Sequence, residues 1–141
     1  MSGPHTGQCL CGQVRLTITA EPLGARICWC RDCQYLASGS PTVNVLFPVE
    51  AVHYEGEITT FERVADSGNT VQRGFCKACG SQLFSRPLTG DAPTRIRAGV
   101  LHNTALIAPQ AIIWADSAPS WASFDPALPR FTKGPDSAPA L

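Results

Sequence analysis

The feature that most constrains this chain is a run of three cysteines, Cys28, Cys30 and Cys33, within six residues. A Cys-x-Cys pair (Cys9 and Cys11) precedes the run and a Cys-x-x-Cys pair (Cys76 and Cys79) follows it. All seven cysteines of the chain therefore fall in short clusters with the spacing of metal ligands. Thiolates are soft donors that suit zinc, and a structural zinc ion takes four ligands in a tetrahedron. Two such ions need eight ligands, and the chain offers seven sulfurs.

These sulfurs divide most simply between two ions. Cys28, Cys30 and Cys33 are close enough in sequence to bind one ion as a unit, and the two outer pairs then complete a four-thiolate site. The alternative gives the triple a fourth sulfur from one of the pairs, and we disfavour it because closed structural sites are typically built from intact pairs. Three protein ligands plus a water or substrate are typical of a catalytic zinc ion. The other candidates for a fourth ligand are the three histidines, His5, His53 and His102.

Length and composition indicate one globular domain spanning residues 1–141. Apolar residues make up 44% of the chain and charged residues 16%, which is typical of a chain with a packed core. The formal net charge is zero, so the sequence lacks the basic character of proteins that bind nucleic acid or anionic membranes. The opening MSGPHTGQ lacks the basic and apolar regions of a signal peptide. We therefore expect a cytoplasmic protein whose thiols are free or bound to metal.

The hydrophobic pattern indicates a mostly β fold. Strict alternation over residues 13–19 predicts a strand with Val14, Leu16 and Ile18 facing the core. Cys9 and Cys11 are expected on one face of a strand, and residues 30–36 in a helical turn. Residues 51–54 and 58–63 are expected to form a hairpin, and the proline-rich segment from Asp116 a coil laid across the body. The other expected strands are residues 42–47, 70–75, 82–85, 95–101 and 111–114.

Three motifs carry a resemblance to a known family. The segments Gly7–Gly12, Cys28–Gln34 and Gly74–Ser81 resemble the three signatures of the glutathione-dependent formaldehyde-activating family, which includes centromere protein V. Near the C-terminus, Ile113–Asp116, Trp121 and Leu128–Phe131 are similar to the tail of that family. The resemblance covers residues 7–131 and leaves residues 132–141 as a C-terminal tail.

This resemblance implies a single-domain β-tent of antiparallel sheets with two zinc sites. Carried over by motif, the outer pairs hold a structural Zn²⁺ and the triple holds a catalytic, more labile Zn²⁺. The activity that names the family joins glutathione to formaldehyde, giving S-hydroxymethylglutathione, and is classed as that of a carbon–sulfur lyase. The structural ligands are then Cys9, Cys11, Cys76 and Cys79, and the catalytic ligands Cys28, Cys30 and Cys33.

One residue departs from the family pattern. The family commonly has a histidine where this chain has Trp29, and an indole can neither relay a proton nor bind metal. Trp29 either narrows the mouth of the site or packs in the core, and we favour packing because large aromatic side chains are mostly buried. Arg31 and Asp32 either orient the substrate beside the ligands or form an exposed ion pair on a turn.

Three hypotheses for function follow. The leading one is a zinc-dependent carbon–sulfur lyase acting on a small thiol, such as glutathione, and an aldehyde. The alternative is a non-catalytic, zinc-stabilised binding module in which a protein ligand completes the second site. A third is a thiol redox protein using Cys30 with Cys33 or Cys28. Aromatic side chains of the tail also offer a surface for a homodimer.

Overall fold

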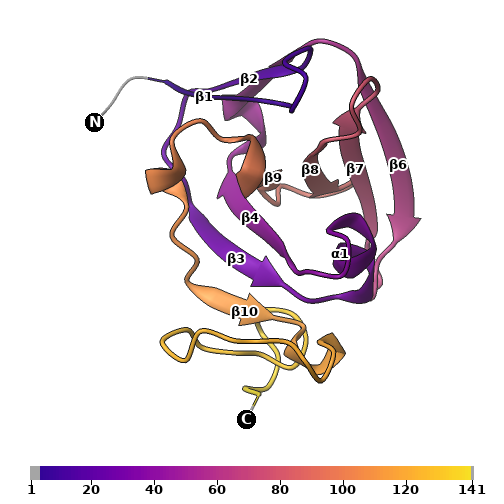
Figure 1. Cartoon of the computed structure of the whole chain (residues 1–141), viewed down its shortest axis with the longest axis vertical. Helices are drawn as coiled ribbons and strands as arrows, with labels where there is room; N and C mark the ends of the chain where they lie inside the picture. Colours follow the sequence, from indigo (N-terminus) through magenta and orange to yellow (C-terminus); the bar gives the residue numbers. More distant parts are fainter. Residues whose placement is uncertain (1–3, 141) are drawn as a thin grey trace.

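The structure, a computed structural model, describes residues 4–140 (Figure 1). It confirms a mostly β fold with one short α-helix and four 3-10 turns among those residues. The strands and the helix are β1 (His5–Gln8), β2 (Arg15–Ile18), β3 (Gly24–Cys28), α1 (Arg31–Leu36), β4 (Thr42–Phe47), β5 (Val52–Glu55), β6 (Ile58–Val64), β7 (Thr70–Cys76), β8 (Gln82–Pro87), β9 (Thr94–Arg97) and β10 (Ala111–Ile113). None of the helices in this part of the chain is long and apolar enough to cross a membrane.

The strands form two sheets. A three-stranded sheet has the order β1-β2-β5, and a seven-stranded sheet has the order β10-β3-β4-β9-β8-β7-β6. Every pairing is antiparallel except that of β10, which runs parallel to β3. The two sheets contribute to one hydrophobic core, which contains Leu16 and Ile18 from the smaller sheet and Val45, Phe47 and Ile96 from the larger. The alternation seen in the sequence around β2 is thus confirmed.

The larger sheet has a second face, and the alternation of side chains decides what it carries. On β9, Thr94 and Ile96 are buried in the core, so Arg95 and Arg97 project to the opposite side. On β4, Val45 is fully buried in the core, so its neighbour Asn44 also projects to that opposite side. This second face is therefore rich in polar groups, and it is the face on which the cysteine triple lies.

Two of the local expectations are wrong. Residues 51–63 do not form a hairpin, because β5 pairs with β2 whereas β6 pairs with β7 in the other sheet. Val52 of β5 is buried in the shared core, where β5 completes the smaller sheet. Most of β6 is exposed, and β6 lies at the edge of the larger sheet. Cys9 and Cys11 do not lie on a strand, because β1 ends at Gln8 and a turn follows.

The remaining expectations hold with altered boundaries. The helical turn is α1, and residues 42–47, 70–75 and 82–85 lie on strands. The strand expected over 95–101 ends at Arg97, where a 3-10 turn takes over. β1 and β3 were not anticipated; β3 (GARIC) lacks a clear alternation because both of its faces are partly covered.

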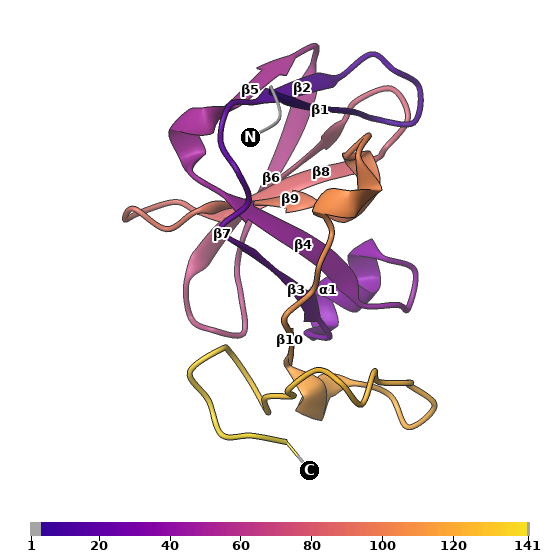
Figure 2. The ribbon, with the colours of Figure 1, turned by 90° about the vertical axis from the view of Figure 1, so that its left-hand side faces the viewer.

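The C-terminal segment lies alongside β10 (Figure 2). The Ile112 N–H donates to the Pro129 carbonyl at 2.9 Å, and the Phe131 N–H donates to the Ile112 carbonyl at the same distance. The Trp114 N–H donates to the Lys133 carbonyl at 2.8 Å. These bonds cover the outer edge of β10, which would otherwise present unpaired backbone groups to solvent. The expected proline-rich coil is therefore present and docked on the sheet edge.

Candidate metal centres and the pocket

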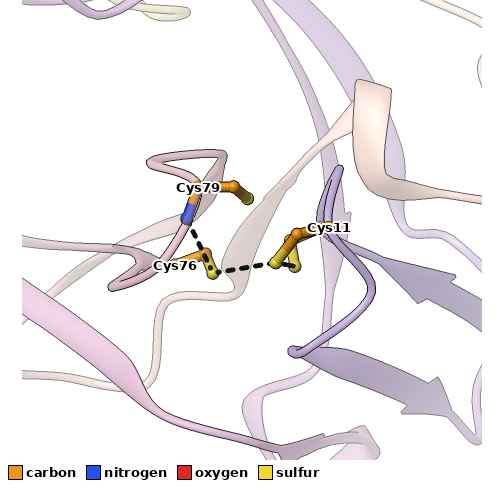
Figure 3. A group of neighbouring side chains, drawn as sticks. Cys11, Cys76 and Cys79 are labelled. Carbon is orange, nitrogen blue, oxygen red and sulfur yellow. Dashed lines mark hydrogen bonds between the residues drawn. The ribbon is translucent and has the colours of Figure 1, made fainter.

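The two outer cysteine pairs come together although they are more than 60 residues apart. Cys9 and Cys11 lie in the turn after β1, whereas Cys76 ends β7 and Cys79 lies in the turn that follows it. Figure 3 shows the side chains of Cys11, Cys76 and Cys79 close together. The four sulfur atoms are all within 4.8 Å of one another. The Cys9 and Cys11 sulfurs are 3.5 Å apart, and those of Cys11 and Cys76 are 3.8 Å apart. Four cysteine sulfurs grouped in this way are the donor set of a structural zinc site.

The backbone around this four-cysteine cluster directs N–H groups at the sulfurs and turns tightly after each cysteine pair. The Val14 N–H donates to the Cys9 sulfur at 3.3 Å, and the Cys79 N–H donates to the Cys76 sulfur at 3.4 Å. Gly12 and Gly80 each end a cysteine turn with positive φ, at 81° and 78°, which L-residues rarely adopt. Because N–H donors stabilise thiolates, the residues present fit a bound zinc ion.

The three remaining cysteines form a second cluster at the junction of β3 and α1. Cys28 ends β3, Cys30 is the N-cap of α1, and Cys33 lies in its first turn. All three are buried, and their sulfurs lie within 4.8 Å of one another. The Cys33 N–H donates to the Cys30 sulfur at 3.4 Å, so the start of the helix itself holds the cluster in shape. The structure therefore groups the seven sulfurs as four and three, without splitting either of the outer pairs.

A line of polar groups supports Cys33 from the neighbouring strands. The Thr42 hydroxyl donates to the Cys33 sulfur at 3.0 Å, and the Asn44 amide donates to the Thr42 hydroxyl at 3.0 Å. The Arg97 guanidinium donates to the side-chain oxygen (Oδ1) of Asn44 at 2.5 Å. All three supporting residues are buried. Such outer contacts orient ligands and stabilise their charged form.

The triple cannot ionise fully without a cation. Hydrogen bonds from Cys28 and Cys30, with a smaller contribution from Thr42, lower the pKa of Cys33 to about 2. Hydrogen bonding to Cys30 and Cys33, together with burial, raises the pKa of Cys28. The bond with Cys28 lowers the pKa of Cys30, but the contact with Cys33 and burial outweigh it and raise that pKa to about 11. Three buried sulfurs that oppose one another's ionisation form a donor set that fits a soft divalent cation such as Zn²⁺.

No histidine, aspartate or glutamate within residues 4–140 joins the three sulfurs. The candidate histidines have other surroundings: the His5 ring bonds to Glu21 at 2.5 Å, and the His102 ring bonds to Thr6 at 2.9 Å. His53 lies exposed on β5 in the other sheet. The described part of the chain therefore offers three candidate metal ligands in the second cluster, all of them sulfur.

Trp29 packs in the interior, as expected. Only 4% of its surface is exposed, and its ring makes edge-on contacts with Trp121 at 6.4 Å and Phe124 at 6.1 Å between centroids. The Gln34 side-chain amide donates to the Trp29 carbonyl at 2.7 Å and closes the loop. The residue between the first two cysteines of the triple therefore anchors the C-terminal segment.

Arg31 and Asp32 do not pair with each other. Arg31 is exposed, donates to Gln34 at 2.6 Å and lies over the ring of Tyr35. Asp32 turns the other way and accepts from Arg63 at 3.1 Å and from Arg73 at 3.3 Å. The aspartate thus connects the helix to β6 and β7, and Arg31 takes no part in the site.

The triple lies in a pocket of about 220 Å³ on the polar face of the larger sheet. Four arginines line this pocket, one from β3, one from β7 and two from β9. Trp114, which has an unusual positive φ of 57°, also lines it. Sequence reasoning missed these arginines, because alternation shows which residues of one strand share a face but not which strands are neighbours. Arg95 and Arg97, spaced two apart on a strand with apolar partners, were the available signal. The arginines are Arg26, Arg73, Arg95 and Arg97.

A comparison with solved structures supports the fold. A crystal structure of a Rhodobacter sphaeroides protein matches with a TM-score of 0.56 over 70% of this chain and 88% of that chain. The two sequences are 18% identical, so the likeness extends to the fold alone. Among proteins with curated descriptions, none matches the chain significantly.

A family model matches across most of the domain. It covers residues 4–117, which include both cysteine clusters and all ten strands. The model is described as that of the glutathione-dependent formaldehyde-activating enzyme. Its match, together with the two cysteine clusters, gives the resemblance read from the motifs an independent basis. This chain belongs to the family of glutathione-dependent formaldehyde-activating enzymes.

Proposed function

We propose that the protein is a zinc-dependent carbon–sulfur lyase that joins a small thiol to an aldehyde, in the manner that names its family. The observation that carries the proposal is the three-cysteine cluster at the wall of a pocket, with no fourth ligand among the described residues. Three protein ligands beside an accessible cavity are typical of a catalytic zinc ion, whereas four are typical of a structural one. Membership of the family supplies glutathione and formaldehyde as the reference substrates.

In this proposal each cluster has its own role. Cys9, Cys11, Cys76 and Cys79 hold the structural ion, which ties the turn after β1 to the turn after β7. Cys28, Cys30 and Cys33 hold the catalytic ion. A zinc ion bound there lowers the pKa of an incoming thiol and keeps it as the thiolate nucleophile.

The chain's own residues prepare the pocket for this reaction. Thr42 donates to the Cys33 sulfur, and the buried Asn44 and Arg97 hold that hydroxyl in place. In the overall reaction a sulfur–carbon bond forms, the carbonyl π bond breaks, and the hydroxyl oxygen gains the proton that the thiol gives up. Trp29 is buried among aromatic rings, so no proton relay at that position takes part.

The test measures exchange, because thiols and formaldehyde also combine spontaneously. Exchange spectroscopy with ¹³C-formaldehyde and glutathione gives the rate at which label moves between the free and thiol-bound forms at equilibrium. We expect zinc-loaded protein, at two zinc ions per chain, to raise this rate well above the protein-free rate. The variant Cys33→Ser should lose the acceleration while keeping the zinc ion of the four-cysteine cluster.

A second measurement separates the enzyme from a binding module. Cobalt substituted at the triple reports its ligands through sulfur-to-metal absorption bands. If the protein is a lyase, added glutathione changes these bands as an exogenous thiol joins the three cysteines. A protein with two bound metal ions, unchanged cobalt bands and no acceleration would be a zinc-stabilised module, and the proposal would be wrong.

A further inference from the structure

The register of the larger sheet gathers the four arginines on the face that carries the cysteine triple. Arg26 and Arg97 lie on either side of β4 at the same level. Arg95 and Arg73 lie on either side of β8 in the same way. These residues come from three strands, β3, β7 and β9, that are not consecutive in the sequence. All four guanidinium groups nevertheless line one small pocket with Cys28, Cys30 and Cys33.

Two of these arginines are buried with part of their hydrogen-bonding capacity unused. Arg73 is 5% exposed and Arg97 is 7% exposed. Within the described structure, Nε and Nη1 of Arg73 and Nε of Arg97 have no hydrogen-bond partner. A buried donor without a partner destabilises the protein, and more so when it is charged. Such donors beside a cavity are therefore positioned for a ligand that accepts them.

The charges lining the pocket do not balance. Among the residues that the structure describes, the ion pairs leave Arg26, Arg95 and Arg97 without a carboxylate, and Arg73 shares Asp32 with Arg63. Burial lowers the pKa of both Arg95 and Arg97; the charge of the cysteine triple acts against this lowering, and the neighbouring guanidinium groups add to it. Like charges are thus crowded into a site of low polarity.

A count of formal charges gives the sign of the excess. Four guanidinium groups stand against Asp66, the one carboxylate lining the pocket, and against Asp32, which pairs with Arg73 from outside it. Three thiolates on a divalent zinc ion contribute one further negative charge. Positive charge therefore remains in the pocket before a substrate binds, and this favours an anionic group such as a carboxylate.

We propose that the pocket binds a carboxylate group through Arg73, Arg95 and Arg97, and that the substrate is a small acid. The proposal rests on the lyase function proposed above and specifies its substrate class. The planar fork of arginine matches a carboxylate in two-point hydrogen bonds, which a neutral substrate cannot form. The carboxylate belongs either to the thiol or to the aldehyde that reacts with it.

The position of the arginines also sets the length of the substrate. Arg97 is connected to Cys33 through only two side chains, those of Asn44 and Thr42. The cavity of about 220 Å³ is smaller than the roughly 300–1,000 Å³ of pockets that enclose drug-sized ligands. A carboxylate bound there lies a few bonds from the reacting sulfur or carbonyl carbon, as in a mercapto acid or an oxo acid.

Calorimetric binding to the zinc-loaded protein tests the thiol as the source of the carboxylate. The probes are mercaptoacetate and 2-mercaptoethanol, which differ in the acid group. If the thiol carries the carboxylate, mercaptoacetate binds at least about tenfold more tightly, and Arg95→Gln removes that preference. Arg86→Gln is the matched control, because Arg86 lies on β8 but lines a different cavity, and it should leave the preference intact. A preference for mercaptoacetate that came from chelation of the metal by its acid group would persist in Arg95→Gln.

The second arm tests the aldehyde. With 2-mercaptoethanol as the thiol, the exchange rate is measured for glyoxylate and for formaldehyde, with and without Arg95→Gln. A preference for glyoxylate that depends on Arg95 assigns the carboxylate to the aldehyde. The proposal is overturned if neither arm shows a preference, or if the preference persists in Arg95→Gln. Failure of the lyase function is a separate result: no acceleration for any pair, with the Arg95-dependent binding of mercaptoacetate retained. Zinc content and circular dichroism check that Arg95→Gln is folded.

Discussion

Asp32 is the residue whose replacement most directly tests how this site is assembled. Its carboxylate accepts from Arg73 at 3.3 Å and from Arg63 at 3.1 Å. The side chains of Asp32 and Arg73 are 11% and 6% exposed, whereas that of Arg63 is 57% exposed. One carboxylate thus forms a buried pair and a solvent-exposed pair at the same time. Asp32→Asn keeps the shape and one acceptor oxygen but removes the charge that both arginines share.

The expected loss follows from the buried pair. Removing one partner of a buried ion pair costs about 3–5 kcal/mol, because the other charge stays buried without compensation. The exposed pair with Arg63 contributes at most about 1 kcal/mol. Since the asparagine oxygen still accepts a hydrogen bond, we expect Asp32→Asn to lower the free energy of unfolding by about 3 kcal/mol. That is a large part of the roughly 5–15 kcal/mol that stabilises a typical domain.

Urea unfolding of the zinc-saturated protein measures this loss. With a slope of about 1–3 kcal/mol per M, a 3 kcal/mol loss lowers the midpoint by about 1–3 M. Arg63→Gln is the matched control, because it removes only the exposed pair, and its free energy of unfolding should fall by less than about 1 kcal/mol. Zinc content is determined for each variant, so that loss of an ion is not mistaken for loss of the pair. Equal effects of the two variants, at equal zinc content, would refute the reasoning.

Three further predictions concern packing and metal binding. Gly74→Ala should destabilise the fold by about 1–3 kcal/mol in thermal unfolding, because the added Cβ would lie 2.2 Å from a ring carbon of Phe84. Gly99→Ala is the control and should have little effect, because no atom lies within 4 Å of the added Cβ. Trp29→Ala should lower stability by about 3–5 kcal/mol in urea unfolding, because the indole is buried; a loss under 1 kcal/mol would contradict this. Cys76→Ser should remove one zinc ion per chain and leave the protein largely unfolded by circular dichroism, since a structural zinc ion contributes on the order of 10 kcal/mol; a folded variant would show that the cluster is dispensable.

Several parts of the fold were accessible to local reasoning. The alternation around Val14, Leu16 and Ile18 marked a half-buried strand, and all three side chains are buried. Trp29 was expected to pack, and it does. The hairpin expected over residues 51–63 failed because strand pairing is decided by distant partners: β5 completes the small sheet beside β2, and no local pattern distinguishes that pairing from a hairpin.

The site divides in the same way. Cysteine spacing by itself determined how the sulfurs group, because ligands on one short segment must reach the same ion whatever the rest of the chain does. Only the tertiary structure decided what surrounds the triple: the register of five strands brings Asn44, Arg73 and Arg97 to it from distant parts of the chain. Side-chain alternation is a local property, whereas the order of strands in a sheet is set by the packing of the whole core, and that order placed the arginines beside the sulfurs.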